Sequence, residues 1–525
     1  MMDDTTSPYS TYHSVRSIRN QSAWALAPIA VFICYVVLRH NRKSVPAASA
    51  GSHSILEPLW LARLRFIRDS RFIIGQGYSK FKDTIFKVTK VGADIIVVAP
   101  KYVEEIRRLS RDTGRSVEPF IHDFAGELLG GLNFLESDLQ TRVVQQKLTP
   151  NLKTIVPVME DEMHYALVSE LDSCLDGSEH WTRVDMIHML SRIVSRISAR
   201  IFLGPKYCRN DLWLKTTAEY TENLFLTGTL LRFVPRMLQK WIAPLLPSFR
   251  QLQENRQAAR KIISEILTDH QPEKHDETSD NGDPYPDILT LMFQAARGKE
   301  KDIEDIAQHT LLLSLSSIHT TALTMTQALY DLCAYPQYLD PVKHEIADTL
   351  QSEGSWSKAM LDKLHMMDSL LRESQRLSPV FLLTFNRILH TPLTLSNGIH
   401  LPKGTRIAAP SDAILNDPSL VPGPQPADTF DPFRYINHST GDAKKTKTNF
   451  QTTSLQNMAF GYGKYACPGR FYVANEIKLV LGHLLMHYEF KFPPGMGRPV
   501  NSTVDTDMYP DLGARLLVRK RKMEE

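Results

Sequence analysis

The chain has 525 residues, of which 42% are hydrophobic, so it is long enough to bury a large core in one large domain or two smaller ones. Its formal net charge is only +3, which gives no reason to expect a nucleic-acid partner. The five cysteines are scattered and odd in number, which argues against a disulfide framework and is typical of a reducing compartment (Cys34, Cys174, Cys208, Cys333 and Cys467).

The N-terminal region carries one membrane signal, the uncharged apolar run at 22–38. The run is short for a full span of about 20 residues, but snorkelling flanks can extend it. Basic residues follow directly at 39–43, which predicts that the body of the chain stays in the cytosol. A cleaved signal peptide is the alternative, but these basic residues lie between the apolar run and the small residues at 47–50, which is the wrong order. We therefore predict an N-terminal tail (1–21), a transmembrane anchor (22–38), a basic flank and linker (39–54) and one large domain (55–525).

The body is predicted to be mainly α with small β-sheets. Alternating β-branched residues at 85–100 predict a strand pair, and helical patterns dominate from there to about residue 380. A polar segment at 271–286 has the composition of an exposed connection. Short apolar runs return at 384–410, where Asn397-Gly398 and Lys403-Gly404 predict hairpins.

The longest predicted helix runs from Ile303 to about Ala334 without proline or glycine. Asp302 can cap it, and at 1.5 Å per residue it would be about 48 Å long, enough to cross a globular body. Its middle, at 311–323, is apolar on most faces yet contains small hydroxyl residues and a histidine. A buried helix needs a reason to carry such polar groups.

A second helix contains Leu371-Arg-Glu-Ser-Gln-Arg-Leu377 and ends at Ser378-Pro379. Glu373 and Arg376 lie three residues apart and therefore share a face. Such pairs are usually exposed and weak, but the apolar residues that follow directly favour a buried pair that needs a further partner.

The segment Phe460-Gly-Tyr-Gly-Lys-Tyr-Ala-Cys-Pro-Gly469 is the most informative in the chain. Its glycines let the backbone turn tightly and approach a flat object. Pro468 is expected at the first position of a helix, whose positive end would favour the thiolate of Cys467. A lone shielded thiolate suits the axial position of a haem iron. The alternatives are an inert buried thiol, a catalytic nucleophile, or a zinc ligand with His483 and His487, for which too few ligands lie close in sequence.

This segment resembles the haem-binding signature of the cytochrome P-450 family, Phe-x-x-Gly-x-Arg-x-Cys-x-Gly, at four positions (Phe460, Gly463, Cys467 and Gly469). The resemblance implies that haem b binds here, with Cys467 as the axial ligand of its iron. Tyr465 stands where the family usually has an arginine that contacts a haem propionate. The departure weakens one anchor of the haem, although a tyrosine hydroxyl can still donate a hydrogen bond to a carboxylate.

The long helix resembles the family helix that crosses the oxygen-binding face of the haem and usually reads Ala-Gly-x-Asp/Glu-Thr-Thr. Residues 316–321 occupy these positions. Thr320 matches the threonine that hydrogen-bonds dioxygen and helps to deliver protons, whereas His319 replaces the usual acid and can still pass protons. From the residues alone, Thr320 could instead bond its own helix carbonyl, and His319 could be a satisfied core histidine.

Two further parts of the family pattern concern buried charges. The resemblance implies that Arg434, in Phe430-Asp-Pro-Phe-Arg434, completes a structural triad with Glu373 and Arg376 behind the cysteine loop. The helix that usually offers a tryptophan and an arginine to the propionates should lie near 139–150. It contains no tryptophan, and its candidates are Arg142, Gln145 and Lys147.

The motifs occur in family order, which implies the cytochrome P-450 fold with the haem between the long helix and the cysteine loop. The implied activity is a haem-thiolate monooxygenase that oxidises an apolar small molecule with O2. Electrons would come from NADPH through an NADPH–cytochrome P-450 reductase, because the chain contains no Gly-x-Gly-x-x-Gly fingerprint. The resemblance places pocket-lining residues on the long helix and in the segment after Pro379 (Leu312, Leu315, Ser316, Phe381, Leu383 and Phe385).

The motifs are similar to those of filamentous-fungal members that oxidise terpenoids and other secondary metabolites. Such members imply a single-pass protein of the endoplasmic reticulum membrane whose catalytic domain faces the cytosol and contacts lipid. Two alternatives stay open at this point. One is a haem-thiolate isomerase or dehydratase that needs no external O2, which the missing acid at 319 favours. The other is a membrane-anchored cysteine hydrolase with Cys467 as its nucleophile.

Overall fold

The structure is a computed structural model that describes residues 45–52, 54, 57–175, 180–269, 286–436 and 449–522. The predicted tail and anchor lie outside the described residues, as does nearly all of the polar segment at 271–286. The chain divides into two compact units, residues 47–391 with 404–525 and residues 1–46 with 392–403. No helix within the described ranges is both long and apolar enough to cross a membrane.

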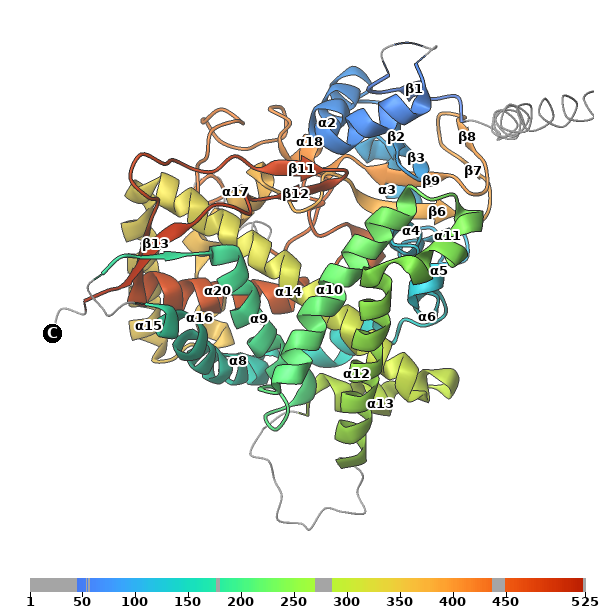
Figure 1. Cartoon of the computed structure of the whole chain (residues 1–525). Helices are drawn as coiled ribbons and strands as arrows, with labels where there is room; N and C mark the ends of the chain where they lie inside the picture. The colour runs from blue at the N-terminus through green and yellow to red at the C-terminus, as the bar shows by residue number, and fades with distance from the viewer. Residues whose placement is uncertain are drawn as a thin grey trace, which may run out of the picture. The chain divides into compact units, whose positions relative to one another are not determined.

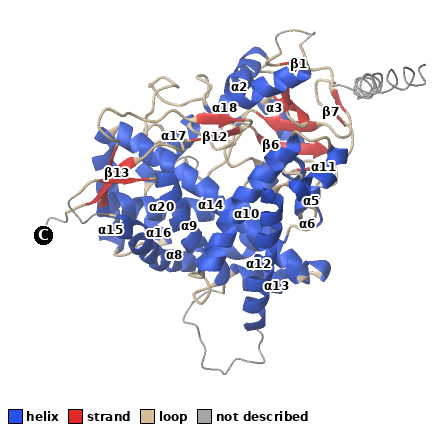
Figure 2. Cartoon of the chain, in the orientation of Figure 1, coloured by secondary structure: helices blue, strands red, loops and turns tan. Residues whose placement is uncertain are grey.

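Helices make up most of the described chain, as predicted (Figure 2). They are α2 (Leu59–Lys80), α3 (Pro100–Ile106), α4 (Glu118–Asp123), α5 (Gly126–Leu129), α6 (Asn133–Glu136), α7 (Leu139–Val143), α8 (Leu152–Ala166), α9 (Met186–Leu203), α10 (Asp211–Arg232), α11 (Arg236–Ile242), α12 (Pro247–Asp269), α13 (Ile288–Ala295), α14 (Ile303–Ala334), α15 (Leu339–Glu353), α16 (Lys358–Asp362), α17 (His365–Leu377), α18 (Ser411–Leu415) and α20 (Arg470–His487).

The strands are short and form small sheets. They are β1 (Ala48–Ser49), β2 (Ile85–Lys90), β3 (Ala93–Val98), β4 (Gly114–Arg115), β5 (Thr182–Val184), β6 (Thr384–Leu389), β7 (Leu393–Thr394), β8 (His400–Leu401), β9 (Arg406–Ala409), β10 (Tyr488–Lys491), β11 (Ser502–Val504), β12 (Asp507–Tyr509) and β13 (Leu516–Lys520). The largest sheet has the order β1-β2-β3-β9-β6-β4, and a second has the order β10-β13-β5.

The predicted strand pair at 85–100 is confirmed, since β2 and β3 are antiparallel with Ile85 opposite Val98. The prediction of a linker through residue 54 is wrong for β1, which pairs in parallel with β2 and adds an edge strand. Small residues have low strand propensity, so nothing local marks this segment as a strand. Its pairing is fixed by β2 and by the hydrogen bond from the Ala50 N–H to the Lys87 carbonyl, at 2.8 Å.

The region at 384–410 contains one of the two predicted hairpins. β7 and β8 form an antiparallel pair around Asn397-Gly398, where Gly398 has a φ of +83° that suits glycine. The second prediction is wrong, because β9 pairs with β6 and with β3 instead of closing a hairpin at Lys403-Gly404. These partners come from distant parts of the chain, so turn chemistry alone does not indicate them.

α14 has the predicted bounds and is the central element of the larger unit. The carboxylate of Asp302 accepts a hydrogen bond from the Glu304 N–H at 2.9 Å and thereby caps the helix. Residues on most faces of α14 are buried, and the helix contacts α9, α12, α17 and α20 (Figure 1). α14 is therefore a rigid support for any side chain along its middle.

Candidate functional site

The cysteine loop, residues 460–469, turns back on itself before α20. Gly461 and Gly463 each have a φ of +73°, a conformation in which a side chain would be strained. The carbonyl of Phe460 accepts a hydrogen bond from the Cys467 N–H at 2.7 Å, which closes the loop. Packing also favours glycine at 463, because an added Cβ would lie 3.3 Å from the Cβ of Arg107, a tight contact. The loop therefore holds the Cys467 sulfur in one position.

The expected helix follows this loop, but it begins later than predicted. α20 starts at Arg470 with Gly469 as its N-cap, so Pro468 precedes the helix instead of opening it. The N–H groups of Gly469 and Arg470 hydrogen-bond to the sulfur and act to lower the pKa of Cys467, but burial dominates and raises this pKa above its usual value. The N-terminal end of α20 alone therefore does not favour the thiolate form of Cys467, contrary to the expectation from the sequence. A bound metal ion would deprotonate the thiol.

The middle of α14 has one accessible stripe on an otherwise buried helix. Leu312, Ser316 and Thr320 follow one another at intervals of four residues and therefore share a face. Ser316 is exposed and Thr320 is half-buried, so no element in the described part of the chain packs fully against this stripe. The Thr320 hydroxyl donates a hydrogen bond to the Ser316 carbonyl at 2.9 Å, the helix contact that the sequence left open as an alternative.

His319 is largely buried, and its Nε2 atom has no hydrogen-bond partner within the described part of the chain. It is therefore not a satisfied core histidine at this nitrogen. Burial lowers the pKa of the His319 imidazole, so the ring is neutral at neutral pH. A neutral imidazole offers one donor and one acceptor nitrogen.

A buried arginine that the sequence analysis did not identify lies beside the cysteine loop. Arg387 on β6 stacks over the ring of Tyr465 at 4.6 Å and over the ring of Phe385 at 4.4 Å. It is 3% exposed, and no carboxylate of the described residues pairs with it. Its Nη1 group donates a hydrogen bond to the Asn386 carbonyl at 2.7 Å. Burial lowers the pKa of Arg387 to about 10.

Local backbone geometry sets the position of this arginine. The pairing of β6 with β9 shifts register between Thr384 and Arg387, and Phe385 within the shift has a φ of +58°. Strain of this kind is retained where the surrounding structure imposes it, often next to functional sites. The signal in the sequence was an arginine within an apolar strand, but the sequence does not show which loop that strand faces.

The predicted buried triad is assembled in the structure. Glu373 Oε2 lies 2.8 Å from Arg376 Nε, and Glu373 Oε1 lies 3.0 Å from Arg434 Nε. All three side chains are almost fully buried. The other N–H groups of Arg434 reach the carbonyls of the loop that leads to it, at distances of 2.8–3.0 Å (Pro422, Gln425, Pro426 and Thr429). The triad therefore fixes a long irregular segment onto α17.

The remaining predicted pocket residues differ in accessibility. Leu315, Leu383 and Phe385 are buried, whereas Leu312 is partly buried against the core. Phe381 is 43% exposed and forms an isolated β-bridge with Asp507. Lining of a substrate pocket by these residues stays a prediction.

The candidates for propionate contact near 139–150 do not form a charged cluster aimed at one ligand. Arg142 pairs with Asp138 at 2.7 Å and with Glu300 at 2.9 Å, so its charge is already neutralised. Gln145 and Lys147 are exposed. Arg387 and Tyr465 are better placed for this role. Both are beside the cysteine loop, and the buried Tyr465 hydroxyl has no hydrogen-bond partner within the described ranges.

Two alternative roles for Cys467 lack support among the described side chains. A zinc site at Cys467 would need His483 and His487 as further ligands, but His483 instead lies with Glu160 and His164 of α8. A cysteine hydrolase would need a base next to the Cys467 thiol, and no histidine hydrogen-bonds to Cys467 within the described ranges.

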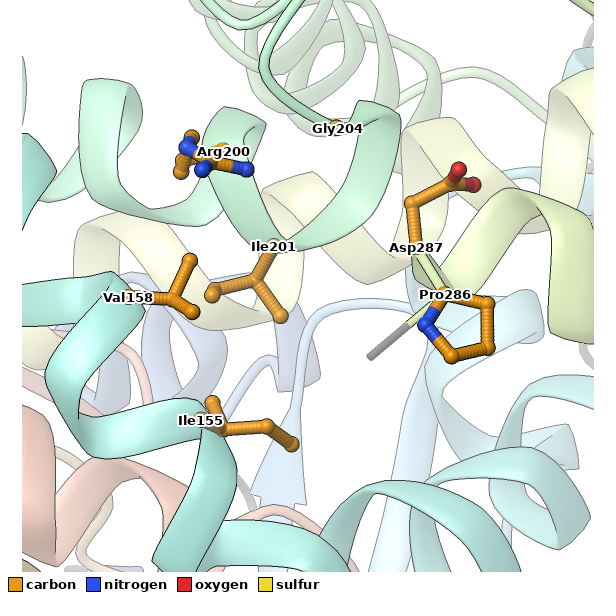
Figure 3. A pocket seen from close by; sticks show the side chains of 7 residues that line it. All are labelled: Ile155, Val158, Arg200, Ile201, Gly204, Pro286 and Asp287. Atoms are coloured by element: carbon orange, nitrogen blue, oxygen red, sulfur yellow. The ribbon is translucent and has the colours of Figure 1, made fainter. Parts of the chain in front are cut away.

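Figure 3 shows a small depression between α8, α9 and the start of α13. Its lining includes Ile155, Ile201 and Pro286 and none of the predicted site residues. Asp287, the acid at its rim, caps α13 by accepting a hydrogen bond from the Thr290 N–H at 2.7 Å. The depression is large enough for little more than water, so it is not a substrate site.

The features around the cysteine loop fit a flat, anionic, metal-containing group. The loop offers one half-buried cysteine sulfur, and among the described residues no atom lies within 4 Å of a Cβ added to Gly469, which leaves open space at that end of the loop. Within the described ranges, Arg387 offers a buried positive charge that no carboxylate compensates, and Tyr465 offers a buried hydroxyl without a hydrogen-bond partner. Haem, with one iron and two carboxylates, matches these donors.

Comparisons with known proteins agree with this description. The family model described as cytochrome P-450 matches residues 74–508. An ent-kaurene oxidase of Gibberella intermedia is 51% identical over 494 residues, which cover 94% of this chain and 91% of that protein. The monooxygenase AN1598 of Emericella nidulans is 43% identical over 479 residues, covering 91% of this chain and 88% of that protein. The solved structure of retinoic acid-bound cyanobacterial CYP120A1 is 19% identical, has a TM-score of 0.67 and covers 91% of this chain and 100% of its own, which shows a shared fold.

Proposed function

The chain belongs to the cytochrome P-450 family of monooxygenases, and from this premise we propose that it oxidises a terpenoid such as ent-kaurene. One oxygen atom of O2 would enter a C–H bond of the substrate, and the other would leave as water with two electrons from NADPH and two protons. The observation that carries the proposed substrate is the 51% identity with an ent-kaurene oxidase over 94% of this chain.

We propose that Cys467 binds the haem iron and that Arg387 and Tyr465 bind its carboxylates. Haem, when bound, supplies a thiolate-ligated iron that activates dioxygen. The closed cysteine loop holds the sulfur in one position through the Phe460 carbonyl and the two glycines with positive φ. A carboxylate beside Arg387 would remove the cost of burying that guanidinium alone. The Glu373 triad, which fixes the segment before the loop, has a structural role in this proposal.

The accessible stripe of α14 supports proton delivery by Thr320 and His319. The Thr320 hydroxyl donates to the Ser316 carbonyl, so its oxygen lone pairs remain available to accept a hydrogen bond from water or from histidine. The neighbouring His319 has a free buried Nε2 and a neutral ring, which can accept a proton at one nitrogen and release one at the other. Ser317 is turned away, with its hydroxyl 3.3 Å from that of Ser198 on α9.

Replacing Thr320 by valine tests this role, because valine keeps the shape of the side chain and removes the hydroxyl. We expect substrate oxidation per NADPH consumed to fall by roughly 100-fold, the low end of what proton transfer from a positioned group typically contributes. The measurement is the amount of ent-kaurene oxidised per NADPH consumed by the full chain in the presence of a reductase and O2. Thr320→Ser is the matched control and should keep most of the coupling.

Either of two results in this assay would contradict the proposals. If Thr320→Val and wild type oxidised the same amount of substrate per NADPH consumed, Thr320 would have no role in proton delivery. Formation of a rearranged product without NADPH would contradict the monooxygenase reaction and favour the isomerase or dehydratase.

Replacing Arg387 by methionine is expected to weaken haem retention while leaving the protein folded. Methionine fills the apolar space between Phe385 and Tyr465 and removes a buried charge, so the apoprotein should be at least as stable as wild type. Loss of one charge-assisted hydrogen bond predicts roughly 10-fold weaker haem binding. The measurement is haem transfer to a haem-scavenging protein. Arg387→Lys should retain part of the affinity, and equal transfer rates in Arg387→Met and wild type would show that Arg387 does not bind the haem.

We also propose that the protein is held at a membrane, by the anchor predicted at 22–38 and by an apolar surface of the larger unit. Around α11 the side chains of Met237, Trp241 and Leu245 are 84%, 69% and 70% exposed. Exposed apolar residues with a tryptophan are typical of a surface that enters the headgroup region. The predicted location at the endoplasmic reticulum membrane and the reductase partner belong to the same proposal.

A further inference from the structure

Two helices distant in sequence bring four ionisable side chains to one place in the larger unit. Glu160 and His164 lie four residues apart on α8, and His483 and His487 lie four residues apart on α20. Each pair therefore shares one face of its helix. Ligand atoms of Glu160, His164 and His483 all lie within 4.8 Å of one another, and the His164 and His483 rings are 4.8 Å apart. This cluster contains none of the residues assigned above to haem or substrate.

His483 is the unexplained member of the cluster. It is 2% exposed, and neither ring nitrogen has a hydrogen-bond partner within the described ranges. Trp356 stacks on its ring at 4.2 Å. This packing depends on Gly482, because a Cβ there would lie 2.5 Å from the Trp356 ring. A phenylalanine would fill the same space without two unsatisfied polar atoms, so packing alone does not account for histidine.

Two of the three ligand atoms face each other across one turn of α8. Glu160 Oε1 and His164 Nε2 are 3.8 Å apart.

We propose that Glu160, His164 and His483 form a zinc site that joins α8 to α20. Two imidazole nitrogens and one carboxylate oxygen are a donor set that Zn²⁺ prefers, with water completing the tetrahedron. Ligand atoms around such an ion lie about 3.3 Å apart. The cluster must therefore tighten slightly, and the 57% exposed His164 side chain is free to move. His487 stacks near His483, with ring centroids 5.8 Å apart, and is not required as a ligand.

The site would fix the C-terminal half of α20, the helix that follows Cys467, against α8. Because Zn²⁺ would bind the folded chain and not the separated helices, it should raise the free energy of unfolding by an amount that grows with the logarithm of the free zinc concentration over its Kd. It would not take part in the oxidation.

The test is calorimetric titration of ZnCl2 into the full-length holoprotein, prepared without a histidine tag and treated with EDTA. We expect one equivalent of Zn²⁺ to bind and to raise the unfolding midpoint. His164→Ala and Glu160→Gln should each weaken this binding at least 10-fold and abolish the shift of the midpoint. His188→Ala on α9 is the matched control, because His188 is also an exposed helical histidine and should not change binding.

The haem spectrum of each variant reports folding independently of zinc, so loss of binding in a misfolded variant would be recognised. Absence of stoichiometric Zn²⁺ binding by wild type would overturn the proposal. Equal affinity in His164→Ala, His188→Ala and wild type would also overturn it, since the bound zinc would then lie elsewhere.

Discussion

Replacing Cys467 by serine is expected to abolish monooxygenase activity, to below about 1% of wild type, because a serine hydroxyl does not supply the thiolate that this chemistry needs. The side chains are similar in size, and the N–H groups of Gly469 and Arg470 can hydrogen-bond to either atom. The fold should therefore survive. The measurements are ent-kaurene turnover with a reductase and the absorption spectrum of the purified protein.

Cys174→Ser is the matched control for this variant. Cys174 is an exposed free cysteine whose sulfur contacts only local groups, the Glu170 carbonyl at 3.1 Å and the Ser173 hydroxyl at 4.0 Å. Its replacement should leave both turnover and spectrum unchanged. Wild-type turnover by Cys467→Ser would contradict the assignment of the axial ligand.

Replacing Glu373 by glutamine should produce the largest loss of stability in the chain. Glu373 neutralises two arginines that are almost fully buried, and its Oε1 also accepts a hydrogen bond from the Asp431 N–H at 3.1 Å. Removing one partner of a buried charge network typically costs about 3–5 kcal/mol, because the remaining charges are left uncompensated. We expect a lower denaturation midpoint and a low yield of haem-containing protein.

Asp362→Asn provides the comparison for a surface ion pair. Asp362 pairs with Lys358 within α16, and because the Asp362 side chain is exposed and that of Lys358 only half-buried, loss of the pair should cost at most about 1 kcal/mol. Denaturation midpoints of both variants, measured by circular dichroism, test the difference. If Glu373→Gln denatured at the same point as Asp362→Asn, the triad would not stabilise the fold as described.

Local sequence patterns predicted the elements whose signals are local. The helix at Ile303–Ala334 was predicted with its exact cap because its apolar pattern is unbroken, and the pair β2–β3 followed from alternation. The family resemblance identified Arg434 as the partner of Glu373, and the structure brings these two side chains together. Spacing alone could not have paired residues that lie 61 positions apart.

What the sequence could not predict depends on pairings between distant segments. The small residues of β1 have no strand pattern and are typical of a linker, and β9 joins β3 and β6 across most of the chain. The role of Arg387 depends on its stacking on Tyr465, a contact between residues far apart in sequence. His483 and His487 share a helix face by spacing, but their neighbours on α8 lie more than 300 residues earlier.

The difference spectrum of the reduced wild-type protein with carbon monoxide tests the central claim most directly. Binding of haem with Cys467 as its thiolate ligand predicts the red-shifted Soret band that distinguishes thiolate-ligated haem from haem with a nitrogen ligand. A folded protein that takes up no haem would contradict the account. A spectrum of haem without thiolate ligation would contradict the role of Cys467.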